Sequence, residues 1–471
     1  MASTTAQPEE PTELRRVLGP KLLLLFIIGD ILGTGVYALT GQVAAEVGGA
    51  AWLPFAIAFA VALLTALSYL ELVTKYPQAA GAALYVHKAF GLHFLTFMVA
   101  FTVMCSGITS ASTASRAFAS NLAVGTDWEA SNAQIMLIAL GFMLLIAAIN
   151  LRGVSEGVKT NVVLTMIELS GLLLVILVGL WAVVGGDADW GRVIAFDTPD
   201  DKNVFLAATT ATSLAFFAMV GFEDAVNMAE ECHEPNRIFP KIMLTGLGIT
   251  GLIYVLVSIT AVALVPVGEL AGNDTPLVTV VERGAPDLPI DTILPFISMF
   301  AVANSALINM LMASRLLYGM AKQGVIPRSL AKVSRRQTPW LAIAFTTVLS
   351  LGLIAYVSNA SDEAVQVLGG TTSLLLLAVF AVVNTAVLVL RRDPVDHSHF
   401  RTRAPIALLG VVTCVYLVTP LSGRPGSQYE IAAILLAIGL VLSVPMYVLS
   451  RRRGEPLQVS APDDLPPHDI P

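Results

Sequence analysis

Long apolar segments separated by short polar loops limit the possible folds of this chain more than any other feature. A helix needs about 20 apolar residues to cross the hydrocarbon core of a bilayer, and the sequence contains about twelve such segments. With 56% hydrophobic and 13% charged residues, the chain has too little charge to cover a soluble protein of this size. We therefore predict an all-α polytopic membrane protein with 12 transmembrane helices. The segments are 21–46, 50–74, 89–121, 131–150, 159–185, 204–230, 240–265, 290–322, 339–358, 363–391, 404–421 and 428–450.

The loops between these segments alternate in charge. One set is basic and includes Arg15, Arg16, Arg152, Lys159, Arg335, Arg336, Arg391 and Arg392. The other set is acidic and includes Asp127, Glu129, Asp187, Asp189, Asp274 and Asp287. Because cytoplasmic loops are enriched in Lys and Arg, we expect both termini to be cytoplasmic, in a multi-pass protein of the plasma (inner) membrane. The first twenty residues are polar and give no sign of a signal peptide.

The first predicted helix carries an unusual polar run. Residues 26–41 read FIIGDILGTGVYALTG, so that Gly33, Thr34 and Gly35 closely follow Asp30. Glycine weakens a helix and permits non-helical backbone angles. Unpaired peptide groups at membrane depth have to face protein or a water-filled cavity. We interpret this run as a helix break that forms half of a small-molecule site; the alternative is close packing of small residues against a neighbouring helix.

The sixth predicted helix is interrupted at residues 217–222, FAMVGF, directly before Glu223 and Asp224. The first and sixth helices occupy the same position in two sets of five, and because five is odd the second set is inverted in the membrane. Interrupted helices at matched positions of inverted halves indicate the central site of a transporter. Free N–H groups after a break suit a carboxylate, and free carbonyls before it suit an amine. The two breaks therefore suit a zwitterionic substrate.

Three segments resemble signatures of the amino acid–polyamine–organocation (APC) permeases. They are IGDILGTGVYALTG at 28–41, FFAMVGFEDAVNMAEECHEPNRIFP at 216–240 and SRLLYGMAKQGVIP at 314–327. The resemblance implies the 5+5 inverted-repeat (LeuT-like) transporter fold plus two C-terminal helices. It also implies secondary active transport of amino acids or related amines. The chain would then divide into a cytoplasmic tail 1–20, a first repeat 21–185, an extracellular loop 186–203, a second repeat 204–391, helices 11–12 at 404–450 and a cytoplasmic tail 451–471.

The resemblance also assigns roles to residues at both breaks. The substrate carboxylate would be held at Gly33, Thr34 and Gly35. The substrate amine would be held by carbonyls near Ile28, Gly29, Phe217, Ala218 and Val220, with Phe217 as an aromatic gate. Glu223 has two interpretations. It is stabilised by the dipole at the start of the second half-helix, or it faces the site and favours a cationic side chain or a diamine.

Two carboxylates depart from the APC pattern. Position 30 is commonly small and uncharged in that family, but here it is Asp30; a fifth-helix lysine of some branches is replaced here by Glu168. Carboxylates in the membrane interior are costly and usually functional, and two that approach each other cannot both stay ionised cheaply. We consider three interpretations of the pair: a proton site, a Na⁺ site, or structural roles in which Asp30 caps the break and Glu168 bonds a neighbouring hydroxyl.

Other function classes are disfavoured. No GxxxxGK[ST] motif is present, which disfavours ATP-driven transport. The three cysteines, Cys105, Cys232 and Cys414, lack metal-ligand spacing, and we interpret them as small apolar packing residues. We expect no cofactor and no metal site, with a proton or Na⁺ as the coupling ion. An intramembrane enzyme, a channel and a non-transporting membrane sensor are weaker alternatives. We therefore predict a proton-coupled permease, not an enzyme, with a cationic amino acid or polyamine exchanger and a Na⁺-coupled symporter as alternatives. Its partners would be the substrate and the lipid bilayer, with no nucleic acid.

Overall fold

The structure is a computed structural model that describes residues 19–77, 81–152, 157–186, 188–199, 202–232, 234–287, 289–322, 326–334, 338–361 and 363–453. The predicted tails therefore lie almost entirely outside the described residues. The regular elements of the described part are helices, joined by one isolated bridge between Gly48 and Phe196. This confirms the prediction of an all-helical protein.

Eleven helical segments of the described residues are long and apolar enough to cross a membrane. They are built from α1 (Pro20–Leu32) with α2 (Thr34–Val47), α3 (Trp52–Lys75), α5 (His93–Gly125), α6 (Asn132–Arg152), α7 (Gly157–Gly185), α9 (Val204–Ala215) with η2 (Phe216–Met219) and η3 (Asp224–Glu231), α10 (Pro235–Leu264), α13 (Ile290–Lys322), α14 (Trp340–Ala360), α15 (Ala364–Leu390) and α17 (Gly426–Arg453). The remaining predicted segment, 404–421, forms the shorter apolar helix α16 (Ala404–Val418). The protein is a polytopic membrane protein.

Several short helices lie in regions that the sequence analysis placed in loops or joined to a longer helix. The predicted segment 89–121 is divided, because α4 (Gly81–Phe90) ends before Gly91, whose φ of +61° interrupts the helix, and α5 begins at His93. The loop after α10 contains α11 (Val267–Leu270) and α12 (Pro276–Gly284). These two helices are too short for a hydropathy pattern of spanning length to detect.

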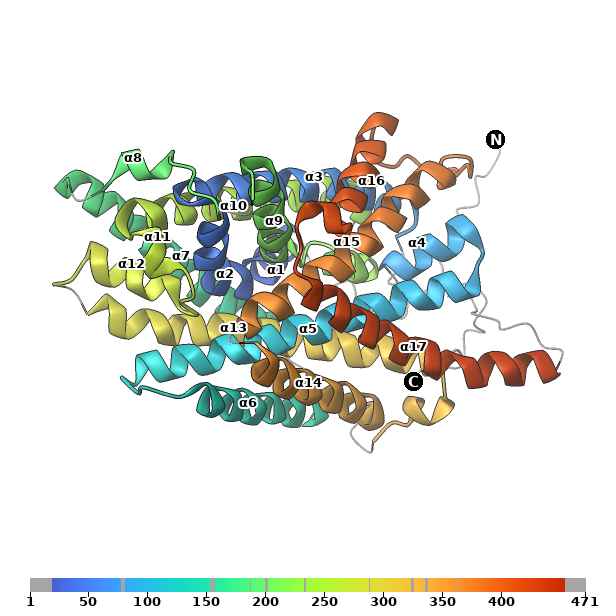
Figure 1. The fold of residues 1–471 in the computed structure, drawn as a ribbon. Helices are drawn as coiled ribbons and strands as arrows, with labels where there is room; N and C mark the ends of the chain where they lie inside the picture. Colours follow the sequence, from blue (N-terminus) through green and yellow to red (C-terminus); the bar gives the residue numbers. More distant parts are fainter. Residues whose placement is uncertain are drawn as a thin grey trace.

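The helices pack around two interrupted segments near the centre of the molecule (Figure 1). Helix α1 packs against α7 and α10, and α2 packs against α9. The long helix α5 packs against both α13 and α15. The largest buried hydrophobic cluster extends over α1, α2, α3, α9 and α10, and a second one joins α5, α13, α14, α15 and α17. The interrupted helices are thus enclosed by protein rather than by lipid.

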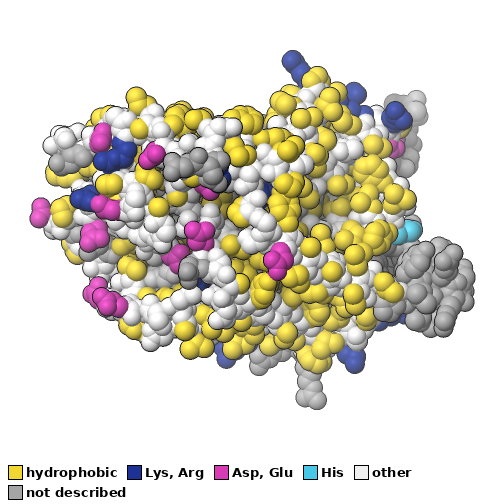
Figure 2. All heavy atoms as spheres, in the orientation of Figure 1, with side chains coloured by type: hydrophobic (Ala, Val, Ile, Leu, Met, Phe, Trp, Pro, Cys, Tyr) yellow, Lys and Arg dark blue, Asp and Glu magenta, His cyan; other side chains and the backbone are white. Residues whose placement is uncertain are grey.

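The surface is consistent with a bilayer environment. On the face in Figure 2, hydrophobic side chains cover most of the middle of the molecule, and carboxylates gather towards the end that carries α8 (Trp190–Val193), α11 and α12. Exposed apolar side chains recur along α6, α7 and α17, for example Leu137, Leu177 and Val441. Such exposure is unfavourable in water but is expected where lipid tails cover the protein.

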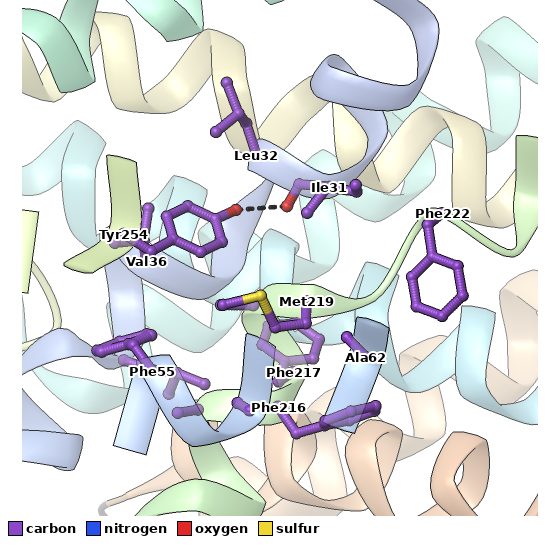
Figure 3. Close-up of a cluster of buried hydrophobic side chains, with 14 of the residues drawn as sticks. Ile31, Leu32, Val36, Phe55, Ala62, Phe216, Phe217, Met219, Phe222 and Tyr254 are labelled. Carbon is purple, nitrogen blue, oxygen red and sulfur yellow. Dashed lines mark hydrogen bonds between the residues drawn. The ribbon is translucent and has the colours of Figure 1, made fainter. Parts of the chain in front are cut away.

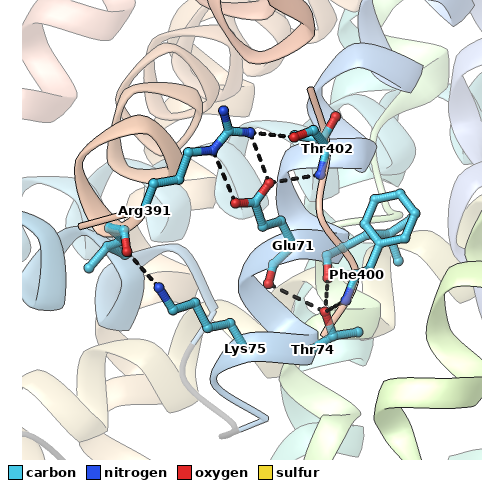
Figure 4. Close-up of polar contacts among 8 residues, drawn as sticks. Glu71, Thr74, Lys75, Arg391, Phe400 and Thr402 are labelled. Carbon is cyan, nitrogen blue, oxygen red and sulfur yellow. Dashed lines mark hydrogen bonds and ion pairs between the residues drawn. The ribbon is translucent and has the colours of Figure 1, made fainter. Parts of the chain in front are cut away.

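At the opposite end from α12, the segment between α15 and α16 is bound to the last turn of α3 (Figure 4). Arg391 makes two hydrogen bonds to the carboxylate of Glu71, of 3.2 and 3.1 Å, and the backbone N–H of Thr402 donates to the same carboxylate at 2.8 Å. The Lys75 ammonium donates to the carbonyls of Leu390 and Asp393. We call Glu71, Lys75, Arg391 and Thr402 the α3–α15 clasp.

Candidate substrate and coupling site

The first helix is broken where the sequence predicted it. Helix α1 ends at Leu32 and α2 begins at Thr34, separated by Gly33 with φ −14° and ψ −149°. A Cβ atom on Gly33 would lie 2.2 Å from the hydroxyl oxygen of Ser305 in α13, so only glycine fits here without movement of Ser305. The break leaves carbonyls at the end of α1 and N–H groups at the start of α2 without helical partners.

The sixth helix is broken over a longer stretch. Helix α9 ends at Ala215 and continues as the 3₁₀ turn η2, after which Val220 is extended and Gly221 has φ +126°. The carboxylate of Glu223 accepts a hydrogen bond of 2.9 Å from the N–H of Gly221. One oxygen of Glu223 therefore satisfies the broken backbone. After Glu223 the chain forms the 3₁₀ helix η3, where an α-helical second half was expected.

The two breaks cross in direct backbone contact. A Cβ atom on Gly35 would lie 2.4 Å from the Cα of Ala218, and one on Gly221 would lie 2.7 Å from the carbonyl of Asp30. The lack of a side chain at Gly35 lets η2 approach α2 closely. The backbone groups of both breaks converge at this crossing, as a substrate site built from main-chain groups requires.

Phe217 lies beside the crossing, between α2 and α15. Its side chain is 5% exposed. A Cβ on Gly369 of α15 would lie 3.4 Å from the Phe217 ring and 3.1 Å from Leu39 of α2. Figure 3 shows Phe217 with Phe216 and Met219 in the buried hydrophobic cluster around the break. The Phe217 ring is therefore packed between α2 and α15.

Hydroxyl groups occupy part of the first break. The Tyr254 hydroxyl of α10 donates to the carbonyl of Ile31, one of the last carbonyls of α1, at 2.5 Å (Figure 3). Of the two predicted carbonyl ligands in α1, Gly29 lies in the last four residues of the helix and Ile28 precedes it. The hydroxyl of Thr34 is buried and has no hydrogen-bond partner among the described residues.

Helix α7 brings Glu168 to the side of the first break. A Cβ on Gly29 would lie 1.8 Å from the hydroxyl of Thr165, so α1 and α7 touch at this point. The Tyr37 hydroxyl of α2 donates to the backbone carbonyl of Glu168 at 2.8 Å. The Glu168 side chain itself is fully buried, and neither carboxylate oxygen has a hydrogen-bond partner among the described residues. Among the described residues, no hydroxyl group makes the hydrogen bond to the Glu168 carboxylate that the structural interpretation expected.

The crossing includes the backbone of Asp30, whose side chain has other carboxylates as electrostatic neighbours. Asp30 has Asp224, Glu223 and Glu168 as acidic electrostatic neighbours. Asp30 is 8% exposed, and its Oδ2 lacks a hydrogen-bond partner within the described part of the chain. In that same part, no three His, Cys, Asp or Glu side chains converge as a metal site would require. Burying a carboxylate without a partner is costly, so Asp30 and Glu168 are the two carboxylates here that local hydrogen bonding leaves least compensated.

Four polar residues near the site, two in α13 and two in α7, were missed by the sequence analysis. Ser305 and Asn304 lie in α13; Ser305 faces Gly33, and the amide nitrogen of Asn304 is buried without a described partner. The adjacent polar pair inside an apolar helix was the available signal. Asn161 and Thr165 share one helical face of α7 with the predicted Glu168, and Thr165 donates to Asn161 at 3.1 Å.

A bundle of membrane-length helices that encloses two crossed helix breaks is the architecture of a polytopic membrane transporter. The chain belongs to the amino acid permease family, whose model matches residues 18–448. This confirms the resemblance to APC permeases.

Relatives of the chain are transporters. The methylthioribose transporter of Bacillus subtilis is 27% identical over 93% of this chain and 95% of its own length. The branched-chain amino acid permease BcaP of the same organism is 25% identical over 94% of both chains. Human cationic amino acid transporter 4 is 27% identical over 81% of this chain and 60% of its own length. The protein is accordingly a membrane transporter of the amino acid permease family.

Proposed function

We propose that the protein is a secondary active transporter that takes up amino acids or related amines across the plasma membrane together with a proton. The backbone contact between the two helix breaks carries this proposal. At the crossing, Gly35 lies against Ala218 and Gly221 against Asp30. Main-chain N–H groups and carbonyls from two helices thus meet inside the membrane, where they can bind both ends of an amino acid.

The substrate-binding residues in this proposal are those of the two breaks. Gly33, Thr34 and Gly35 bind the carboxylate, because the start of α2 offers N–H groups and the unpartnered Thr34 hydroxyl. Carbonyls of Ile28, Gly29, Phe217, Ala218 and Val220 bind the amine. Phe217 is the gate on the side of α2 and α15. Transport follows alternating access, in the 5+5 inverted-repeat arrangement with α16 and α17 as additional helices.

The coupling site in this proposal is Asp30 with Glu168. Both carboxylates are buried, and their unpartnered oxygens favour a neutral, protonated form over an ionised one. The adjacent helices α1 and α7 meet at Gly29 and Thr165, so protonation of Glu168 acts directly on the broken helix. Sodium is the alternative coupling ion, because carboxylate, hydroxyl and carbonyl oxygens are suitable ligands for it.

A second candidate function is exchange of cationic amino acids or polyamines. Asp30 and its three acidic electrostatic neighbours favour a substrate with a second positive charge. In this version Glu223 exchanges its bond to the Gly221 N–H for a substrate ammonium. The same geometry in a protein that binds but does not transport would make it a sensor.

Purified protein in liposomes tests these functions. A labelled panel of branched-chain amino acids, basic amino acids, polyamines and methylthioribose is offered under a pH gradient and, separately, a Na⁺ gradient. We expect accumulation of at least one amino acid or amine that depends on the pH gradient. Accumulation that follows only the Na⁺ gradient would assign sodium coupling, and counterflow without accumulation would assign exchange. Binding without flux would identify a sensor.

A further inference from the structure

Arg424 lies in the connection between α16 and α17, and all five of its N–H donors are used. Three of its hydrogen bonds go to backbone carbonyls, those of Leu417 at 2.7 Å, Gly370 at 2.9 Å and Ser213 at 3.2 Å. The other two go to side chains, the amide oxygen of Gln428 at 2.9 Å and the hydroxyl of Ser373 at 2.8 Å. A guanidinium has five N–H groups, so none is left over. Its side chain is buried, at 6% exposure.

Three of these acceptors lie on the two helices next to Phe217, namely α9 and α15. Ser213 is in the last turn of α9, four residues before Phe217, and Ser373 donates to its carbonyl at 2.5 Å. Gly370 and Ser373 lie in the turn of α15 that also carries Gly369, the residue against the Phe217 ring. Arg424 therefore joins the half-helix that leads into the break to the helix that closes over it.

The connection between α16 and α17 makes further close contacts with α9 and α15. A Cβ on Gly370 would lie 2.0 Å from the side-chain nitrogen of Gln428, and one on Gly423 would lie 2.1 Å from the hydroxyl of Thr210 in α9. The Thr210 hydroxyl also donates to the carbonyl of Ser422 at 3.0 Å. The α16–α17 connection is thus bound to α9 and α15 together.

The contacts of Arg424 are unusual for a buried cation. Among the described residues, its acceptors are carbonyl, hydroxyl and amide oxygens, with no carboxylate. Burial lowers the pKa of Arg424 to about 9, so the group is still charged at neutral pH. The positive charge lies at the carboxyl end of α9, where it is favoured by the helix dipole. Helix separation would expose the guanidinium to water, which can replace these neutral acceptors. The hydrogen bonds of Arg424 therefore hold α9 and α15 together when the helices are in contact, and they can still break when the helices separate.

We propose that Arg424 is a positioning residue of the transport cycle: it holds α9 and α15 together beside Phe217, and the pathway opens on that side only when these bonds break. This proposal rests on the proposed transport function. It gives the two helices outside the ten-helix core a role in gating. The side concerned is the extracellular one in the topology predicted from loop charges.

Sided labelling of a cysteine in the gate tests this proposal. Leu39, fully buried beside Gly369, is changed to Cys after Cys105, Cys232 and Cys414 are replaced by Ala. A membrane-impermeant maleimide is added to right-side-out and to inside-out vesicles. We expect Arg424→Ala to increase labelling from the outside at least tenfold and to leave labelling from the inside unchanged. Arg424→Lys, which has three N–H donors in place of five, should give an intermediate rate.

Arg283→Ala is the matched control, because it removes a guanidinium that pairs on the surface with Glu269. It should label at the parental rate. Equal labelling of Arg424→Ala and its parent from the outside would overturn the proposal. Faster labelling of Arg424→Ala from both sides would also overturn it, because that result indicates a general loosening of the protein. If Arg424→Ala does not yield folded protein, Ser373→Ala removes one acceptor and should increase outside labelling at least twofold; an unchanged rate then overturns the proposal. Labelling requires no transported substrate, so a failure of the uptake panel in the parent would count against the proposed function alone.

Discussion

Gly221 lies against the backbone of Asp30, so that the two interrupted helices meet through main-chain atoms. Gly221 has φ +126°, and a Cβ at this position would lie 2.7 Å from the carbonyl carbon and oxygen of Asp30. Residues other than glycine rarely adopt this backbone conformation. The contact therefore depends on glycine twice, once for the backbone angle and once for the space.

Gly221→Ala tests the importance of this contact. The strained backbone should cost about 1–3 kcal/mol, and the added methyl group should push the breaks apart. We expect a lower melting temperature and at least a tenfold loss of substrate affinity, measured by binding of the substrate that the uptake panel identifies. Gly141→Ala in α6 is the control, since the added methyl would have no neighbour within 4 Å beyond the adjoining residues and backbone of its own helix. Wild-type affinity in Gly221→Ala would show that the crossing is not part of the binding site.

Glu168→Gln tests the proposed coupling site. The substitution keeps the shape of the side chain but removes its titration, so accumulation driven by a pH gradient should be abolished. Exchange of labelled for unlabelled substrate should continue, because the backbone site is unchanged. Both are measured in the same liposomes. Glu282→Gln changes an exposed carboxylate of α12 and should transport like the parent. Intact pH-driven accumulation in Glu168→Gln would exclude Glu168 as the coupling group.

The helix break at Gly33 and the apolar segments could be predicted from local sequence alone. Both depend on short-range features, namely glycine clustering and runs of apolar residues of spanning length. The boundaries of α4, α11 and α12 could not be predicted in this way, because these helices are too short to give a hydropathy signal and are held in place by tertiary packing. Helix α12, for example, buries Leu277, Val278 and Val281 against its neighbours.

Partners across the site could not be predicted from sequence. Gly35 was assigned to ligand access, but its immediate neighbour is Ala218, some 180 residues later in the chain. The contacts of Ser305 with Gly33 and of Tyr254 with Ile31 depend on which faces of α13 and α10 point inward. Those faces are poorly marked in helices that are apolar on all sides.

Glu71→Ala tests the energetic contribution of the α3–α15 clasp. The substitution leaves Arg391, 15% exposed, without its carboxylate partner. Loss of one partner of a buried ion pair typically costs about 3–5 kcal/mol. Because Arg391 is partly exposed, we expect the free energy of unfolding to fall by about 3 kcal/mol. Denaturant unfolding in detergent gives the free energy. The control, Glu234→Ala, breaks a pair whose side chains are 86% and 70% exposed and should change stability by well under about 1 kcal/mol. Equal effects of the two substitutions would refute a stabilising role for the clasp.

Asp274, at the end of the molecule that carries α12, should make the stability of the protein depend on pH. It precedes α12 and accepts a hydrogen bond of 3.0 Å from Ser120. Burial raises the pKa of Asp274 above its ordinary value of 3.8, although nearby Arg116 and the Ser120 bond oppose the change. A carboxyl with a raised folded-state pKa binds its proton more tightly when folded. Its contribution to stability is therefore full below pH 3.8 and is lost as the pH rises through the raised pKa.

Asp274→Asn measures this contribution, because the amide oxygen can still accept from Ser120 while the titration is removed. Melting temperatures of the variant and the wild type are compared in steps from pH 4 to pH 8. We expect the variant to be at least as stable as the wild type at pH 8, and its advantage to shrink as the pH falls and Asp274 takes up its proton. The exposed Asp287→Asn should follow the wild type throughout. If the pH profile of Asp274→Asn runs parallel to that of the wild type, the Asp274 carboxyl does not titrate with folding in this range, and desolvation does not outweigh the opposing Arg116 charge.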